Sequence, residues 1–194
     1  MAAALRCNDV LYAQIHLTLP AWVHEEVDAE RLYADADSRI ALAIDLSRRN
    51  VAHRSGGPFG AAVFNEAGRL IGIGVNRVVP TQCSSAHAEI LALSSSQQRV
   101  QRYRLNEDGA RITLATSSQP CAMCYGALLW AGIDELLIGA NRDDVQTLAG
   151  FDEGPLPADW IGELEQRGIG VQRDLLREHA RDVLRTYGES GIVY

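Results

Sequence analysis

Pro-Cys-Ala-Met-Cys at residues 120–124 and Ala-His-Ala-Glu at residues 86–89 are the stretches that decide how the rest of this chain is interpreted. Together they supply three side chains of the kinds that bind zinc, namely His87, Cys121 and Cys124. They also supply a carboxylate, Glu89, that need not be a ligand. Three protein ligands leave the fourth position of a tetrahedral zinc ion to water, which is the arrangement of a catalytic rather than a structural site.

The spacing of His87 and Glu89 predicts that both lie at the beginning of a helix. Residues two apart point roughly 200° apart around a helix axis, so they cannot share a face in mid-helix. They reach one site only from the first turn, where side chains project across the helix end. Because an apolar run follows at residues 90–93, we expect a helix from about residue 86 to residue 101.

Cys121 and Cys124 also predict a helix start. They are three residues apart and therefore share a helix face. Pro120 suits the first turn, where its missing N–H costs nothing, and residues 125–130 continue the helix. Two helix N-termini would then converge on one metal ion, and their positive dipole ends favour thiolate over thiol.

The composition restricts the classes of function. Hydrophobic residues make up 47% of the 194 residues, enough for a sizeable core. A net charge of −7 and the absence of lysine argue against a broad surface for nucleic acid. Cys7 and Cys83 lie outside the motif; they do not form a disulfide framework, which favours a cytoplasmic protein. No apolar run approaches the roughly 18 residues of a transmembrane helix.

Residues 1–36 are expected to form an N-terminal extension, either a functional arm or, as we favour, surface packing. Residues 37–194 are expected to form one zinc-dependent domain. Its first helix would be capped by Asp37 or Ser38. Two more helices are expected to begin near residues 86 and 120, as argued above. Three others are expected at residues 143–148, 158–167 and 175–187. The expected strands are 59–65, 70–79, 111–116, 135–140 and 169–173. This order predicts an α/β fold, a three-layer α/β/α sandwich with a mixed five-stranded sheet.

With these residues in view, the chain resembles the cytidine-deaminase-like superfamily, and within it the bacterial guanine deaminases. Most of the matching stretches are shared with tRNA adenosine deaminases: residues 58–61, Asn76, 86–89, 120–124, 126–127 and 130–131. Ala-Gly-Phe-Asp-Glu at residues 149–153 is the part that resembles guanine deaminases specifically. Departures from the family are Glu153 in place of the common Asp, the loop at residues 82–85, and the long extension.

The resemblance implies a Zn²⁺ cofactor and hydrolysis of guanine to xanthine and ammonia, with a zinc hydroxide as nucleophile. Glu89 would act as proton shuttle and Glu153 would assist departure of ammonia. The implied substrate-binding residues are Phe59, Asn76, Ala88 through its backbone, Trp130 and Tyr194. The resemblance also implies a homodimer in which Tyr194 closes the site. In some relatives the corresponding C-terminal aromatic residue comes from the partner subunit of a domain-swapped dimer.

Each assignment has a plainer alternative. Cys83 would make the zinc site structural if it were a fourth ligand, and the chain would then be a zinc-stabilised interaction module. The alternative for Glu153 and for Asn76 is a residue in a turn. Phe59 and Trp130 would then belong to the hydrophobic core, and Tyr194 would belong to a frayed chain end. Among enzymes, the alternatives are a tRNA adenosine deaminase and a deaminase of cytosine or of another amino-heterocycle, such as a triazine. The acidic composition speaks against a polynucleotide substrate.

Overall fold

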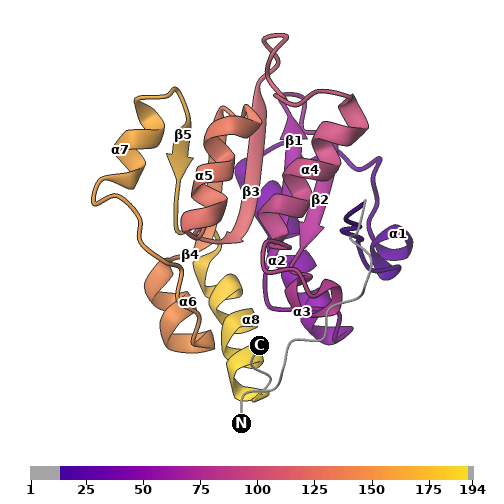
Figure 1. Cartoon of the computed structure of the whole chain (residues 1–194), viewed down its shortest axis with the longest axis vertical. Coiled ribbons are helices and arrows are strands. Elements are labelled where there is room, and N and C mark those ends of the chain that lie inside the picture. Colours follow the sequence, from indigo (N-terminus) through magenta and orange to yellow (C-terminus); the bar gives the residue numbers. More distant parts are fainter. Residues whose placement is uncertain (1–13, 192–194) are drawn as a thin grey trace.

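The structure is a computed structural model that describes residues 14–191, so Cys7 and the proposed site residue Tyr194 lie outside the described residues. Its centre is a five-stranded sheet in the order β2-β1-β3-β4-β5 (Figure 1). The strands are β1 (Gly60–Asn65), β2 (Leu70–Val75), β3 (Ile112–Ser118), β4 (Glu135–Ala140) and β5 (Gly170–Gln172). β2, β1 and β3 pair antiparallel, whereas β3, β4 and β5 pair parallel. The sheet is therefore mixed, and the predicted α/β fold is confirmed.

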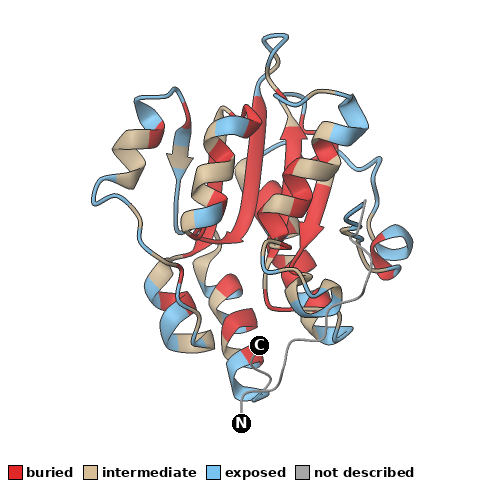
Figure 2. Cartoon of the chain, in the orientation of Figure 1, coloured by how far each residue is buried: buried red, intermediate tan, exposed pale blue. Residues whose placement is uncertain are grey.

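Helices cover both faces of the sheet and form the outer layers. One face packs against α2 (Ala36–Ala52), α6 (Arg142–Ala149) and α8 (Arg177–Glu189), and the other against α4 (Ala88–Val100), α5 (Ala122–Ala131) and α7 (Trp160–Glu165). Successive side chains of a strand point to opposite faces, so Ala62 and Phe64 of β1 join the first core and Ala61 and Val63 the second. Figure 2 shows the central strands as the most buried part of the molecule.

The N-terminal segment packs against the domain. It contains a short helix that the sequence pattern did not predict, α1 (Trp22–Glu26). Trp22 is buried and donates from Nε1 to Ser55 Oγ at 2.9 Å, and Glu26 Oε2 accepts from Arg49 at 2.7 Å. Within residues 14–191, no helix is both long and apolar enough to cross a membrane.

Several predicted boundaries are wrong, and two of them concern the site. β2 ends at Val75, and residues 78–81 form the short helix α3 (Val78–Thr81) instead of continuing the strand. Asn76 therefore directly follows β2. Pro120 precedes α5 instead of lying in its first turn, because Cys121 takes the N-cap position with an extended backbone.

The start of α2 is also earlier than predicted. Its N-cap is Asp35, neither Asp37 nor Ser38. Asp35 accepts from the Ser38 N–H at 2.8 Å, and Ser38 Oγ accepts from the Asp35 N–H, so the two residues form a reciprocal capping box.

Candidate active site

Three potential metal ligands meet at the edge of the sheet where β2 and β3 end and β1 begins. His87 is the N-cap of α4 and Cys121 the N-cap of α5. His87 Nδ1 lies 3.5 Å from Cys121 Sγ and 3.6 Å from Cys124 Sγ. These two helix starts are neighbours because α4 and α5 pack side by side on the same face of the sheet.

The spacing of these atoms fits a zinc ion. Bonds of about 2.3 Å to sulfur and about 2.0 Å to nitrogen, at a tetrahedral angle, separate a sulfur from a nitrogen by roughly 3.5 Å. Within the described residues, the group of ligand atoms lying within 4.8 Å of one another comprises His87, Cys121 and Cys124, without Cys83. Cys83 Sγ instead lies 3.2 Å from Ser85 Oγ. The structure thus offers no support for a site closed by Cys83.

Cys121 and Cys124 shift each other's pKa in opposite directions. Cys124 hydrogen-bonds Cys121, and together with His87 it lowers the pKa of the Cys121 thiol to about 4, although burial acts in the opposite direction. The same hydrogen bond, with burial and the nearby Glu89, raises the pKa of Cys124. A thiolate at a helix N-terminus is the form that binds metal.

Glu89 lies beside the ligands without belonging to their group. It is 6% exposed, and Cys124 Sγ donates to Glu89 Oε2 at 3.4 Å. Burial raises the pKa of the Glu89 carboxyl, and the negative charge of Cys121 adds to the effect. A buried carboxyl that titrates above its usual range is suited to carrying a proton near neutral pH.

A cavity of about 160 Å³ opens above these residues. Drug-sized ligands occupy pockets of about 300–1,000 Å³, so this cavity suits a smaller molecule. Its lining residues come from five separate segments: Phe59, Asn76, His87, Glu89, Gln119, Phe151, Asp152 and Glu153.

Glu153 reaches the cavity from the loop after α6. The Ala122 N–H donates to the Glu153 carbonyl oxygen at 2.8 Å, which attaches this loop to the first residue of α5. The residue is 8% exposed. Burial, followed by the neighbouring Glu89 carboxylate, raises the pKa of Glu153 to about 8. Two carboxyl groups therefore share one small cavity.

The structure brings most but not all of the predicted site residues together. Phe59, Asn76, Glu89 and Glu153 line the cavity. Ala88 is fully buried and does not line it. Trp130 lies near the C-terminal end of α5 with 78% of its surface exposed, and it does not line this cavity. Nine residues after Cys121 correspond to about 13 Å along a helix.

Three lining residues were not predicted as site residues: Gln119, Phe151 and Asp152. Phe151 packs edge-on against Phe59 with ring centroids 5.2 Å apart, so the two rings form one wall. The signals were present, since Gln119 directly precedes the Pro-Cys stretch and the other two precede Glu153. What the sequence lacks is the information that both segments meet at the same sheet edge.

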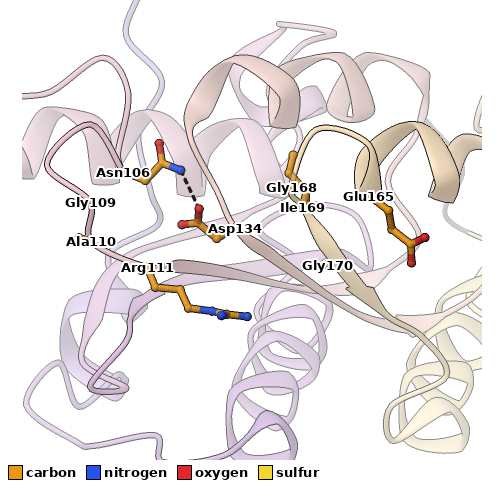
Figure 3. A pocket seen from close by; sticks show the side chains of 9 residues that line it. All are labelled: Asn106, Gly109, Ala110, Arg111, Asp134, Glu165, Gly168, Ile169 and Gly170. Carbon is orange, nitrogen blue, oxygen red and sulfur yellow. Dashed lines mark hydrogen bonds between the residues drawn. The ribbon is translucent and has the colours of Figure 1, made fainter.

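A larger hollow of about 550 Å³ lies at the opposite edge of the sheet, where β3, β4 and β5 begin (Figure 3). Its main carboxylate, Asp134, is already bound: it accepts from Asn106 Nδ2 and from the Ile112 N–H, both at 2.8 Å. None of the predicted site residues lines this hollow. Size alone therefore does not identify the functional cavity.

Comparison with known proteins agrees with this geometry. Residues 35–140 match the family model described as the cytidine and deoxycytidylate deaminase zinc-binding region. The guanine deaminase of Bacillus subtilis is 32% identical over 140 residues, which are 72% of this chain and 86% of that protein. A tRNA-specific adenosine deaminase of Buchnera aphidicola is 31% identical over 131 residues, 67% of this chain and 79% of that protein. A solved structure of guanine deaminase from Nitrosomonas europaea is 44% identical, with a TM-score of 0.85, covering 95% of this chain and 99% of that one.

Proposed function

Because the chain belongs to the cytidine and deoxycytidylate deaminase family and is a deaminase, we propose that it hydrolyses guanine to xanthine and ammonia. The observation that carries this proposal is the position of Glu153, a second buried carboxyl that faces the same small cavity as Glu89. A deaminase needs one proton carrier for the attacking water, and the second carboxyl supplies an acid for the departing amine. The similarity to the guanine deaminases of two bacteria supports the choice of base.

In the proposed reaction, water adds to C2 of guanine, the C2–N bond breaks, and the amino group leaves as ammonia. Zinc, when held by His87, Cys121 and Cys124, supplies the Lewis acidity that makes water nucleophilic near neutral pH. Glu89 takes a proton from the water and delivers it to the ring nitrogen beside C2. Glu153 is protonated at neutral pH, because its pKa is raised to about 8. It donates this proton to the leaving amine and takes up the proton of the new C2 hydroxyl group as the C2 carbonyl forms.

The remaining lining residues hold the base. Phe59 and Phe151 form an aromatic wall against which a planar ring can pack. Asn76 is buried at the end of β2 and presents an amide, which hydrogen-bonds readily to the polar edge of a purine.

A free base is favoured over a base in tRNA by size and by charge. The cavity of about 160 Å³ accommodates a single small ring system. A polynucleotide would need a basic groove with stacking aromatics, whereas the chain carries a net charge of −7 and no lysine. The similar identity to a tRNA deaminase makes that activity the alternative to be tested.

The test is a substrate panel with the zinc-loaded protein. Ammonia release is measured with guanine, adenine, cytosine, a diamino-triazine and a tRNA anticodon stem-loop, and xanthine is identified by its absorbance. We expect guanine to give the highest kcat/KM. Inosine formation in the stem-loop without turnover of guanine would overturn the proposal in favour of the RNA substrate.

We also infer that the protein forms a homodimer through α5. This helix carries no charged residue, and it leaves Met123 and Trp130 exposed at 38% and 78%. Exposed apolar surface of this kind marks contact sites, and the same helix of a second copy would offer an equally uncharged face. Sedimentation at micromolar concentration is expected to give a dimer, and Trp130→Glu a monomer. A monomeric wild-type protein would contradict the inference.

A further inference from the structure

Gln119 links the end of β3 to the start of α5, and its place at the cavity has no structural explanation. Its backbone N–H donates to the Ala140 carbonyl oxygen at 2.8 Å, which fixes the main chain. The residue is 7% exposed and lines the cavity. Among residues 14–191, no side chain or backbone group hydrogen-bonds its side-chain amide.

Among the described residues, the buried polar atoms without a partner are Ser118 Oγ and Arg181 Nε, so the Gln119 amide, which also has no protein partner, remains accessible from the cavity. A ligand that fills the cavity removes this amide from water and must itself supply hydrogen-bond partners, since a buried unpaired amide is costly. Gln119 lines the same cavity as Glu89 and Glu153, so a ligand in that cavity can supply these partners.

Asn76 cannot offer the same free group. Its Oδ1 already accepts from the Gly57 N–H and the Val78 N–H, both at 3.3 Å. Asp152 is directed to solvent, since 86% of its side chain is exposed and its carboxylate pairs with Arg142. Gln119 is therefore the neutral amide at this cavity whose donor and acceptor are both available.

We propose that Gln119 is a specificity-determining residue that binds the ring N–H and adjacent carbonyl of the substrate base; this inference rests on the proposed function. A side-chain amide matches such an edge with two parallel hydrogen bonds: its oxygen accepts from the ring N–H, and its NH₂ donates to the carbonyl. Guanine presents this edge at N1 and O6. A carboxylate at position 119 would repel the O6 oxygen and add a third acid beside Glu89 and Glu153.

The test compares ligands that differ in this edge. Hypoxanthine has the N1–H and O6 groups, purine lacks both, and neither carries the amino group that is removed. Each is measured as a competitive inhibitor of guanine turnover by the wild-type protein and by Gln119→Met, which keeps the side-chain size and loses the amide. Gln166→Met, on the exposed C-terminal end of α7, is the matched control.

For Gln119→Met we expect roughly 10- to 100-fold weaker binding of hypoxanthine, as for the loss of one or two hydrogen bonds to a neutral ligand. Purine binding is expected to stay within about threefold, the KM for guanine to rise, and kcat to change little, which is the signature of lost ground-state binding. Zinc content and melting temperature should match the control.

Equal weakening of hypoxanthine and purine, or no weakening of either, would overturn the role of Gln119. A wild-type protein that does not deaminate guanine would instead refute the proposed function. That result comes from the unaltered protein, so the two failures are distinguishable.

Discussion

Glu89 is placed to transfer protons without binding the metal, so its replacement can distinguish these two roles. It is buried beside Cys124 and stands outside the group of ligand atoms. We predict that Glu89→Gln retains stoichiometric zinc and lowers kcat by at least about 10²–10⁴-fold, because a positioned acid/base contributes that much. Metal analysis and ammonia release measure the two quantities. Loss of zinc in this variant would show that the carboxylate is a ligand, and retained turnover would remove it from the mechanism.

Replacing Glu153 should lower the turnover rate more than it weakens substrate binding. Burial and Glu89 raise its pKa to about 8, so the carboxyl is protonated below that pH and loses its proton as the pH rises through it. We predict that Glu153→Gln lowers kcat about 10- to 100-fold with a smaller change in KM. Wild-type kcat/KM, which reports the pKa values of the free enzyme, should fall as the pH rises through about 8, and the variant should lose this dependence. A variant with unchanged turnover would leave Glu153 a turn residue.

At the scale of elements, α6 and α8 are joined by one buried carboxylate. Asp144 has a side chain only 3% exposed, pairs with Arg177 Nε at 2.7 Å and contacts Arg181. It also accepts from the Asn141 N–H in the capping box of α6. α6 leads directly into the loop that carries Glu153, so Asp144 holds in place the helix from which this loop starts.

We predict that Asp144→Asn lowers the free energy of unfolding by about 1.5–3 kcal/mol, the range for hydrogen bonds to a charged group. Burial opposes ionisation, but Arg177, Asn141 and Arg181 together lower the pKa of Asp144. Its stabilisation is therefore present above the unfolded-state pKa of roughly 3.9 and is lost as the pH falls through the lower folded-state pKa. The deficit of the variant in urea unfolding should shrink in acid.

Asp143→Asn is the control for this comparison, because Asp143 is exposed in the same turn of α6. It should change the free energy of unfolding by less than about 0.5 kcal/mol. If both variants were equally stable, the ion pairs of Asp144 would contribute nothing measurable.

At the scale of the whole molecule, the three proposed metal ligands lie at the starts of two helices that pack on one face of the sheet. We predict that removal of zinc by a chelator abolishes activity reversibly and lowers the melting temperature, since a metal that binds only the folded state stabilises it. Cys124 is fully buried, but the two clusters of apolar side chains that join the sheet to its helices form without it and without His87. We therefore expect the chain to retain its far-ultraviolet circular dichroism after zinc is removed. Complete unfolding on removal of zinc would contradict the prediction that the fold persists without the metal.

Cys83→Ser provides the matched test of the ligand set. Cys83 bonds to Ser85 and lies outside the group of three, so its replacement should leave zinc content and kcat within about twofold of wild type. Cys124→Ser should lose most of the zinc. Loss of zinc in both variants would indicate a fully protein-ligated metal and an inactive, structural site.

The sequence by itself determined which three side chains could hold a metal, the helix starts that present them, and the mixed α/β architecture, because these depend on short-range spacing and on hydrophobic period. The tertiary structure alone decided which distant segments form the cavity. It placed Gln119 and Phe151 there and left Trp130 outside, and it showed that β2 stops before Asn76. The physical reason is that a cavity is formed by strand ends and loops that converge through sheet order and pairing, and residue spacing along the chain carries no record of that convergence.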